Sequence, residues 1–159
     1  MGRKRKRRLK LLDEMDRKII NVLRQDCLTP FVKIAKSLGV NEGTIRHRVK
    51  KLTKHGIIKG FTVATDPAIL GLGAIAFVVV TVNPGHVQQV AQELAKVSYI
   101  LEVHEVHTYG DLLLKVRAPS FGDIANILSN DIKTVEGVIS SQVISVLNVW
   151  KDELVSLLR

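Results

Sequence analysis

Residues 29–56 read TPFVKIAKSLGVNEGTIRHRVKKLTKHG, and they predict the fold of the first part of the chain. Thr29 is a natural N-cap for one helix, and Gly39 is suited to end it. Asn41 is a second capping residue, so a further helix is expected from Asn41 to about His55. A gap as short as Gly-Val between two helices is the tight turn of a helix-turn-helix motif.

A preceding helix is expected from Asp13 to Gln25. Its apolar residues recur with helical period, while Asp13 and Asp16 provide an N-terminal capping pair and suit the helix dipole. The segment from Ile57 to Val63 is rich in β-branched residues and predicts a short hairpin or wing. The chain is therefore divided into a basic arm (residues 1–10), a (winged) helix-turn-helix domain (11–63), a linker (64–73) and a second domain (74–159).

The helix expected over residues 41–55 has one aliphatic stripe and one basic face. Ile45, Val49 and Leu52 are spaced i, i+4 and i+7, so they face the other helices. A basic face opposite such a stripe fits the DNA major groove, although a run of charge can also be a solvated surface. Arg48 lies close to the apolar side and is expected to form a structural ion pair. The residues assigned to DNA on this helix are Asn41, Thr44, Arg46, His47, Lys50, Lys51 and Lys54, with Arg46 and His47 as candidates for base edges and Thr44 or Lys51 for phosphates.

Charge is divided unevenly along the chain. Residues 1–60 hold 18 Lys/Arg and 5 Asp/Glu, a net +13, whereas residues 61–159 hold 6 and 10, a net −4. This split indicates two modules with different partners, the first facing a polyanion such as double-stranded DNA. The basic arm, residues 1–10, has seven Lys/Arg and is the part of the chain where positive charge is most concentrated. It is expected to be disordered when free and to contact DNA, or else to be a solvated tail. Its assigned residues are Arg3, Lys4, Arg5, Lys6, Arg7 and Arg8.

The second half alternates strand and helix in the order βαββαβ. Strands are expected at residues 75–82, 100–107, 112–117 and 138–149, with amphipathic helices after the first and third. This order predicts an α+β, ferredoxin-like module with a four-stranded antiparallel sheet and helices on one face. A short helical turn is expected from Trp150 to Arg159.

Two helices can cover only one face of a four-stranded sheet, so the other face needs a partner. Strand residues such as Val78, Val80, Val143 and Leu147 are expected on that uncovered face, where they are too apolar for water. The economical solution is a second copy packed sheet to sheet, which also doubles the helix-turn-helix. A homodimer is therefore predicted.

Several classes of function are not expected. The longest nearly apolar stretch, residues 68–82, is too short for a transmembrane helix, and no secretory leader precedes the first helix, so a cytoplasmic protein without a membrane partner is predicted. Cys27 is the single cysteine, and His104 and His107 would point to opposite faces of one strand, so no metal or other cofactor is predicted. The sequence has no phosphate-binding loop and no nucleophile elbow, so it is not expected to be an enzyme.

Four motifs stand in order before the βαββαβ module: LDEMDRKI at 12–19, IAKSLG at 34–39, TIRHRVKKL at 44–52 and GIIKGF at 56–61. With this arrangement the chain resembles the Lrp/AsnC (feast/famine) family of prokaryotic transcription regulators over nearly its whole length. The resemblance implies a nucleoid-associated DNA-binding dimer, often assembled as a tetramer of dimers, whose C-terminal domain senses amino acids. Asn41 stands where the family usually has serine.

The resemblance also implies an effector site, at Tyr109, Gly110, Asp111 and Ser141. Gly110 lets a ligand approach the backbone, and Asp111 can pair with an α-ammonium group. The family usually places two residues between this glycine and this aspartate, which are adjacent here. Ser141 matches the first of two threonines in the last strand, and Val143 replaces the second.

Three functions remain open at this level. The first is a sequence-specific transcription regulator, and the second is an architectural nucleoid protein that coats DNA, for which phosphate contacts alone suffice. The third is a small-molecule-binding module that regulates a partner enzyme, for which a helix-turn-helix would be superfluous. Footprinting with competitor DNA separates the first two, because a regulator protects a bounded site.

Overall fold

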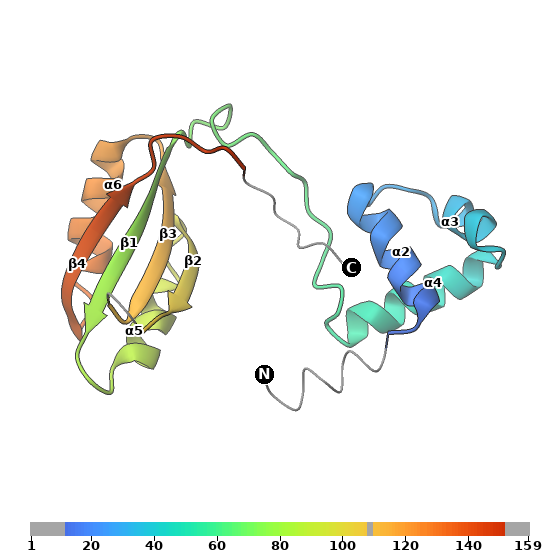
Figure 1. Cartoon of the computed structure of the whole chain (residues 1–159), viewed down its shortest axis with the longest axis horizontal. Helices are drawn as coiled ribbons and strands as arrows, with labels where there is room; N and C mark the ends of the chain where they lie inside the picture. The colour runs from blue at the N-terminus through green and yellow to red at the C-terminus, as the bar shows by residue number, and fades with distance from the viewer. Residues whose placement is uncertain (1–11, 108–109, 152–159) are drawn as a thin grey trace. The chain divides into compact units, whose positions relative to one another are not determined.

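The computed structural model describes residues 12–107 and 110–151 (Figure 1). These residues form two compact units, 12–64 and 65–151, each with its own hydrophobic core. The predictions for the arm residues Arg3 to Arg8 and for Tyr109 lie outside the described residues, as does nearly all of the helical turn expected at the C-terminal end.

The first unit consists of three helices. They are α2 (Glu14–Gln25), α3 (Phe31–Leu38) and α4 (Glu42–Lys54). Their amphipathic faces meet in a core that contains Ile19, Leu23, Ile34, Ala35, Ile45 and Val49. The tight turn between α3 and α4 passes through Gly39, whose φ of 67° is left-handed, as expected for a helix C-cap.

The N-terminus of α3 differs from the prediction. The N-cap is Pro30, with extended backbone and no side-chain cap, and not Thr29. The Thr29 hydroxyl instead donates to Asp26 Oδ2 at 3.1 Å, and Asp26 Oδ1 accepts from the Leu28 amide at 2.9 Å. A carboxylate two or three residues upstream therefore competes successfully for the polar groups of this turn.

The hairpin or wing predicted after α4 is wrong. No strand forms between α4 and the first strand of the second unit, all of which the structure describes. Ile58 packs against the helical core, whereas Phe61 and Val63 are exposed. An extended segment without a neighbouring strand has no ladder partner for its backbone groups, so β-propensity alone does not make it a strand.

The second unit is an α+β sandwich of one sheet and one helical layer, as predicted. Its four strands are antiparallel in the order β2-β3-β1-β4, with α5 and α6 packed on one face (Figure 1). The elements are β1 (Ala74–Val82), α5 (Val87–Leu94), β2 (Ile100–Glu105), β3 (Leu112–Ala118), α6 (Phe121–Ile127), the π-helical turn η1 (Leu128–Ile132) and β4 (Val138–Ser145). The βαββαβ order is therefore confirmed, although β4 ends at Ser145, before the predicted end.

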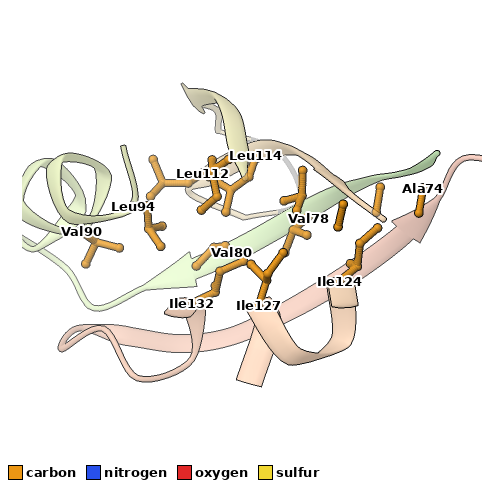
Figure 2. Packing of buried hydrophobic residues seen from close by; sticks show 14 of the residues in the cluster. Ala74, Val78, Val80, Val90, Leu94, Leu112, Leu114, Ile124, Ile127 and Ile132 are labelled. Atoms are coloured by element: carbon orange, nitrogen blue, oxygen red, sulfur yellow. The ribbon is translucent and has the colours of Figure 1, made fainter. Parts of the chain in front are cut away.

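The prediction of which residues face away from the helices was wrong for β1. Val78 and Val80 are fully buried under the helices, beside Leu112 and Leu114 of β3 (Figure 2). Val143 is paired with Val78 and so belongs to the same side, at the sheet edge. Because β1 is apolar at every position from Ala74 to Val80, its alternation cannot show which face is covered, and a shift of one residue exchanges the faces.

Among the described residues, the face without helices is apolar along β1, and it also carries Lys115 of β3 and Gln142 of β4, which are registered with Phe77 and Val79. In β1 it is formed by Phe77 and Val79, which alternate with the buried positions. Their registered neighbours extend it across the sheet, with Leu113 beside Val79 and Ile144, which is exposed, beside Phe77. No helix among the described residues is both long enough and apolar enough to cross a membrane.

Candidate nucleic-acid interface and effector region

The N-terminus of α4 is fixed by its own cap. Asn41 Oδ1 accepts hydrogen bonds from the Thr44 amide at 2.7 Å and from the Thr44 hydroxyl at 2.9 Å. The cap predicted at Asn41 is therefore confirmed. The hydroxyl of Thr44, a candidate for a phosphate contact, is thus part of this cap.

The basic face of α4 lies opposite its buried stripe. Ile45, Val49 and Leu52 are buried, so the other side of the helix is left to polar residues. The exposed basic residues on it are Arg46, His47, Lys50, Lys51 and Lys54. Within the part of the chain that the structure describes, the ammonium groups of these lysines form no ion pair, so their charge is available to a polyanion.

Arg46, the main candidate for base reading, is held from two sides. Its Nη2 contacts Oε1 of Glu42, one helical turn earlier, and its Cζ lies 5.6 Å from the ring centroid of Phe31, the first residue of α3. The side chain is still 68% exposed. Neither neighbour was assigned to the site from the sequence, although the i, i+4 spacing of Glu42 and Arg46 was a readable signal.

Arg48 has the structural role that its position predicted. Its Nη1 lies 2.5 Å from Oδ2 of Asp13 and 2.7 Å from Oδ1 of Asp16, so it joins α4 to the N-terminus of α2. The two aspartates also form a capping box, in which the Asp16 amide donates to Asp13 Oδ1 at 2.8 Å. Asp16 is only 3% exposed, so this ion pair neutralises a buried carboxylate.

The same arrangement shifts two ionisation equilibria. The backbone amide of Asp16, followed by the Arg48 guanidinium, lowers the pKa of the Asp13 carboxyl below its usual value. The carboxylates of Asp13 and Asp16 raise the pKa of Arg48. Since Arg48 is already compensated, it is not part of the charge that α4 presents to a partner.

The turn before β3 is tied to β1. The Asp111 amide donates to the Val80 carbonyl at 2.9 Å, and Asp111 Oδ2 accepts from the Val82 amide at 2.7 Å. A Cβ on Gly110 would lie 2.6 Å from Val79 Cγ1 and 3.1 Å from the Val80 oxygen. Gly110 and Asp111 therefore have roles in the fold itself, and the glycine is required by close packing on β1.

Ser141 is separated from this turn. It is registered with Val80 on the β4 side of β1, whereas Asp111 bonds to Val80 from the β3 side. Because β3 and β4 lie on opposite sides of β1, Asp111 and Ser141 are two strand spacings apart, which is about 10 Å. The Ser141 hydroxyl is buried and has no hydrogen-bond partner among the described residues. The structure thus brings Gly110 and Asp111 together and places Ser141 across the strand from them.

Glu102 of β2 is in contact with His104 of the same strand and with Lys115 of β3. His104 Nε2 lies 2.8 Å from Glu102 Oε2, and Lys115 Nζ lies 3.6 Å from Glu102 Oε1. The hydrogen bond from His104, with the charge of Lys115, lowers the pKa of Glu102. No three metal-binding side chains come together in residues 12–107 and 110–151.

Comparison with known domains accounts for both units. Residues 12–53 match the AsnC-type helix-turn-helix domain, and residues 75–155 match the Lrp/AsnC ligand binding domain. The chain belongs to the Lrp/AsnC family. The family that the sequence motifs indicated is thereby confirmed, and with it a helix-turn-helix transcriptional regulator that carries a ligand-binding domain.

Individual proteins of the Lrp/AsnC family match this chain over almost their full length. The HTH-type transcriptional regulator FL11 of Pyrococcus horikoshii is 38% identical over 141 residues, which is 89% of this chain and 93% of the relative. The regulator LrpA of the same organism is 34% identical over 128 residues, 80% and 91% of the two chains. Escherichia coli AsnC has the same fold, with a TM-score of 0.83 at 24% identity over 91% of this chain and 97% of its own. A Neisseria meningitidis regulator, whose structure is of a complex with L-Met, has a TM-score of 0.81 at 21% identity over 90% and 94%.

Proposed function

We propose that this Lrp/AsnC protein is a sequence-specific transcription regulator that reads the DNA major groove with α4. The observation that carries the proposal is the exposed side of α4, where Arg46 and His47 are followed by three lysines that form no ion pair with any other described residue. A helix of this kind fits the major groove, where arginine reads guanine by two parallel hydrogen bonds. Arg46 and His47 would contact base edges.

Phosphate contacts would hold the helix in register. The C-terminal half of α4 would contact phosphates through its exposed lysines, Lys50, Lys51 and Lys54. The capped N-terminus of the helix, at Asn41 and Thr44, would provide a second phosphate contact. The basic arm, Arg3 to Arg8, would add phosphate contacts or enter an adjacent minor groove. This division assigns sequence selection to α4 and most of the salt-dependent affinity to the lysines and the arm.

The functional unit would be a homodimer joined through the uncovered face of the sheet, assembled further as a tetramer of dimers. Phe77, Val79 and Ile144 support this assignment, because an apolar sheet face without helices favours burial against a second copy. A dimer carries two copies of α4, which suits paired half-sites about one helical turn apart.

The ligand-binding domain would make DNA binding respond to an amino acid. Asp111 uses Oδ2 for the Val82 amide, which leaves Oδ1 to pair with an α-ammonium group. The family resemblance also assigns Tyr109 and Ser141 to the site, although Ser141 lies across β1 from Asp111. The structure of a similar protein is of a complex with L-Met, which is consistent with an amino-acid ligand. An effector acts by binding one subunit arrangement more tightly than another. The protein would act in the cytoplasm, on the nucleoid, without a cofactor or a catalytic step.

Footprinting at moderate salt with competitor DNA tests this function. A bounded, palindrome-like protected region supports a sequence-specific regulator. Even protection along the whole probe would instead assign the chain to the architectural class, for which the net charge of residues 1–60 suffices. The same series, repeated with each of the twenty amino acids, tests the effector, because a true effector changes the occupancy of that region.

A further inference from the structure

An acidic residue lies at the start of the otherwise basic helix α4. Glu42 is the only Asp or Glu in residues 41–55, a stretch with two arginines and three lysines. A carboxylate close to DNA is repelled by the phosphates and so lowers affinity for every sequence. Its presence on the face proposed to read DNA therefore needs a reason.

Stability does not provide that reason. The Glu42–Arg46 pair is exposed, with 43% and 68% of the two side chains accessible. Exposed ion pairs of this kind stabilise a fold by about 0–1 kcal/mol. Glu42 also lies in the first turn of α4, where a negative charge adds only about 0.3–1 kcal/mol through the helix dipole, and Asn41 already caps the helix.

The geometry instead places a donor and an acceptor side by side. Glu42 and Arg46 are one turn apart on the same side of α4, and their carboxylate and guanidinium are in contact. The ring of Phe31, from α3, lies beside the guanidinium and restricts its rotamers. An arginine held in this way loses less side-chain entropy when it binds a planar partner.

Base chemistry matches this pairing. In the major groove guanine presents two acceptors, N7 and O6, which suit arginine, and cytosine presents the N4 amino donor, which suits glutamate. A thymine would bring its O4 acceptor toward the carboxylate, which is unfavourable. A carboxylate beside the arginine thus selects by repulsion as well as by attraction.

We propose that Glu42 is a specificity-determining residue, which accepts a hydrogen bond from cytosine N4 while the adjacent Arg46, positioned by Phe31, binds guanine. This inference rests on the proposed function, in which α4 enters the major groove. It predicts an unusual pair of effects for the loss of Glu42: weaker discrimination between sequences, together with unchanged or tighter binding to random DNA.

The test is selection of binding sites by the full-length protein from a pool of duplexes with a randomised segment. It is followed by titration of the selected duplex and of a random-sequence duplex. The variants are Glu42→Gln and Phe31→Leu.

The matched control is Glu14→Gln, because Glu14 is also the first residue of its helix and pairs with Lys18 one turn later. We expect Glu42→Gln to tolerate other bases at one C·G position of each half-site and to reduce the ratio of selected to random affinity about tenfold. Phe31→Leu should weaken the guanine preference, and Glu14→Gln should select the wild-type motif.

Each other outcome decides against the inference in a distinct way. A Glu42→Gln protein that selects the wild-type motif, with the same affinity ratio as Glu14→Gln, would make Glu42 a surface ion pair only. A uniform loss of affinity on selected and random DNA would make its role structural. If the wild-type protein itself enriches no motif, the proposed function fails, and the role of Glu42 fails with it.

Discussion

Removal of Arg48 should destabilise the helix-turn-helix unit strongly, although the residue lies at the surface of one helix. In Arg48→Met the apolar part of the side chain is largely kept, while the guanidinium that contacts Asp13 and Asp16 is lost. The side chain of Asp16 is only 5% exposed, so its carboxylate would remain nearly buried without its cation.

The expected magnitude follows from the two partners. Breaking a buried ion pair by removing one member costs about 3–5 kcal/mol, whereas an exposed pair contributes about 0–1 kcal/mol. Asp16 belongs to the first class and Asp13, which is half exposed, to the second. Because Asp16 Oδ2 keeps a long hydrogen bond of 3.3 Å from the Asp13 amide, we expect a loss of about 3 kcal/mol.

Amide hydrogen exchange of buried residues in α2 and α4 is the assay, because it reports the stability of this unit separately from the sheet. Arg46→Met is the control, since Arg46 lies two residues away and is exposed; it should cost under about 1 kcal/mol. Adding Asp16→Asn to Arg48→Met should recover part of the loss, because a neutral amide is easier to bury than an unpaired carboxylate. Equal effects of Arg48→Met and Arg46→Met would refute the reasoning.

Three other features of the molecule can be tested separately: the capping aspartate Asp13, the packed glycine Gly110 and the basic arm. The pKa of Asp13 is lowered from 3.8, first by a backbone amide and then by a guanidinium, so its ionised form stabilises the fold above about pH 4 and that stability is lost as the pH falls through the folded pKa. Asp13→Asn should therefore flatten the acid limb of the unfolding curve of the first unit, and an unaltered limb would contradict this. Gly110→Ala should cost about 1–3 kcal/mol in thermal unfolding, because its Cβ would lie 2.6 Å from Val79, whereas Gly73→Ala, which meets no atom within 4 Å, should be nearly neutral. Deletion of residues 1–10 should flatten the plot of log K against log salt, by about 0.9 for each lost phosphate contact, with the same protected sequence; an unchanged slope would make the arm a solvated tail.

Helices with a clear apolar periodicity and a good N-cap residue were predictable from the sequence. The helices α2 and α4 follow from their aliphatic stripes and from Asp13 and Asn41, whose capping bonds are present. The order of the four strands follows from apolar runs interrupted by turns. The structural role of Arg48 followed from its place near the apolar side of α4.

The errors have physical causes that a single sequence does not reveal. Val78 was placed on the wrong side because β1 is apolar on both faces, so only the position of the helices decides which side is covered. The hairpin after α4 failed because strand formation depends on a distant partner and not on propensity. The packing of Gly110 on Val79 was not foreseen either, because that contact joins the turn to a distant strand; its assignment to an effector stays a prediction. Phe31 was missed at Arg46 because that contact joins two helices.

Interference mapping of the selected site shows whether α4 reads bases in the major groove. Methylation of guanine N7 and replacement of thymine by uracil alter only the major-groove edge, whereas methylation of adenine N3 alters only the minor-groove edge. We expect major-groove changes within each half-site to prevent binding of the wild-type protein, and we expect Arg46→Ala to lose its sensitivity to at least one guanine. Binding that is blocked by adenine N3 methylation alone, with every major-groove change tolerated, would contradict this expectation.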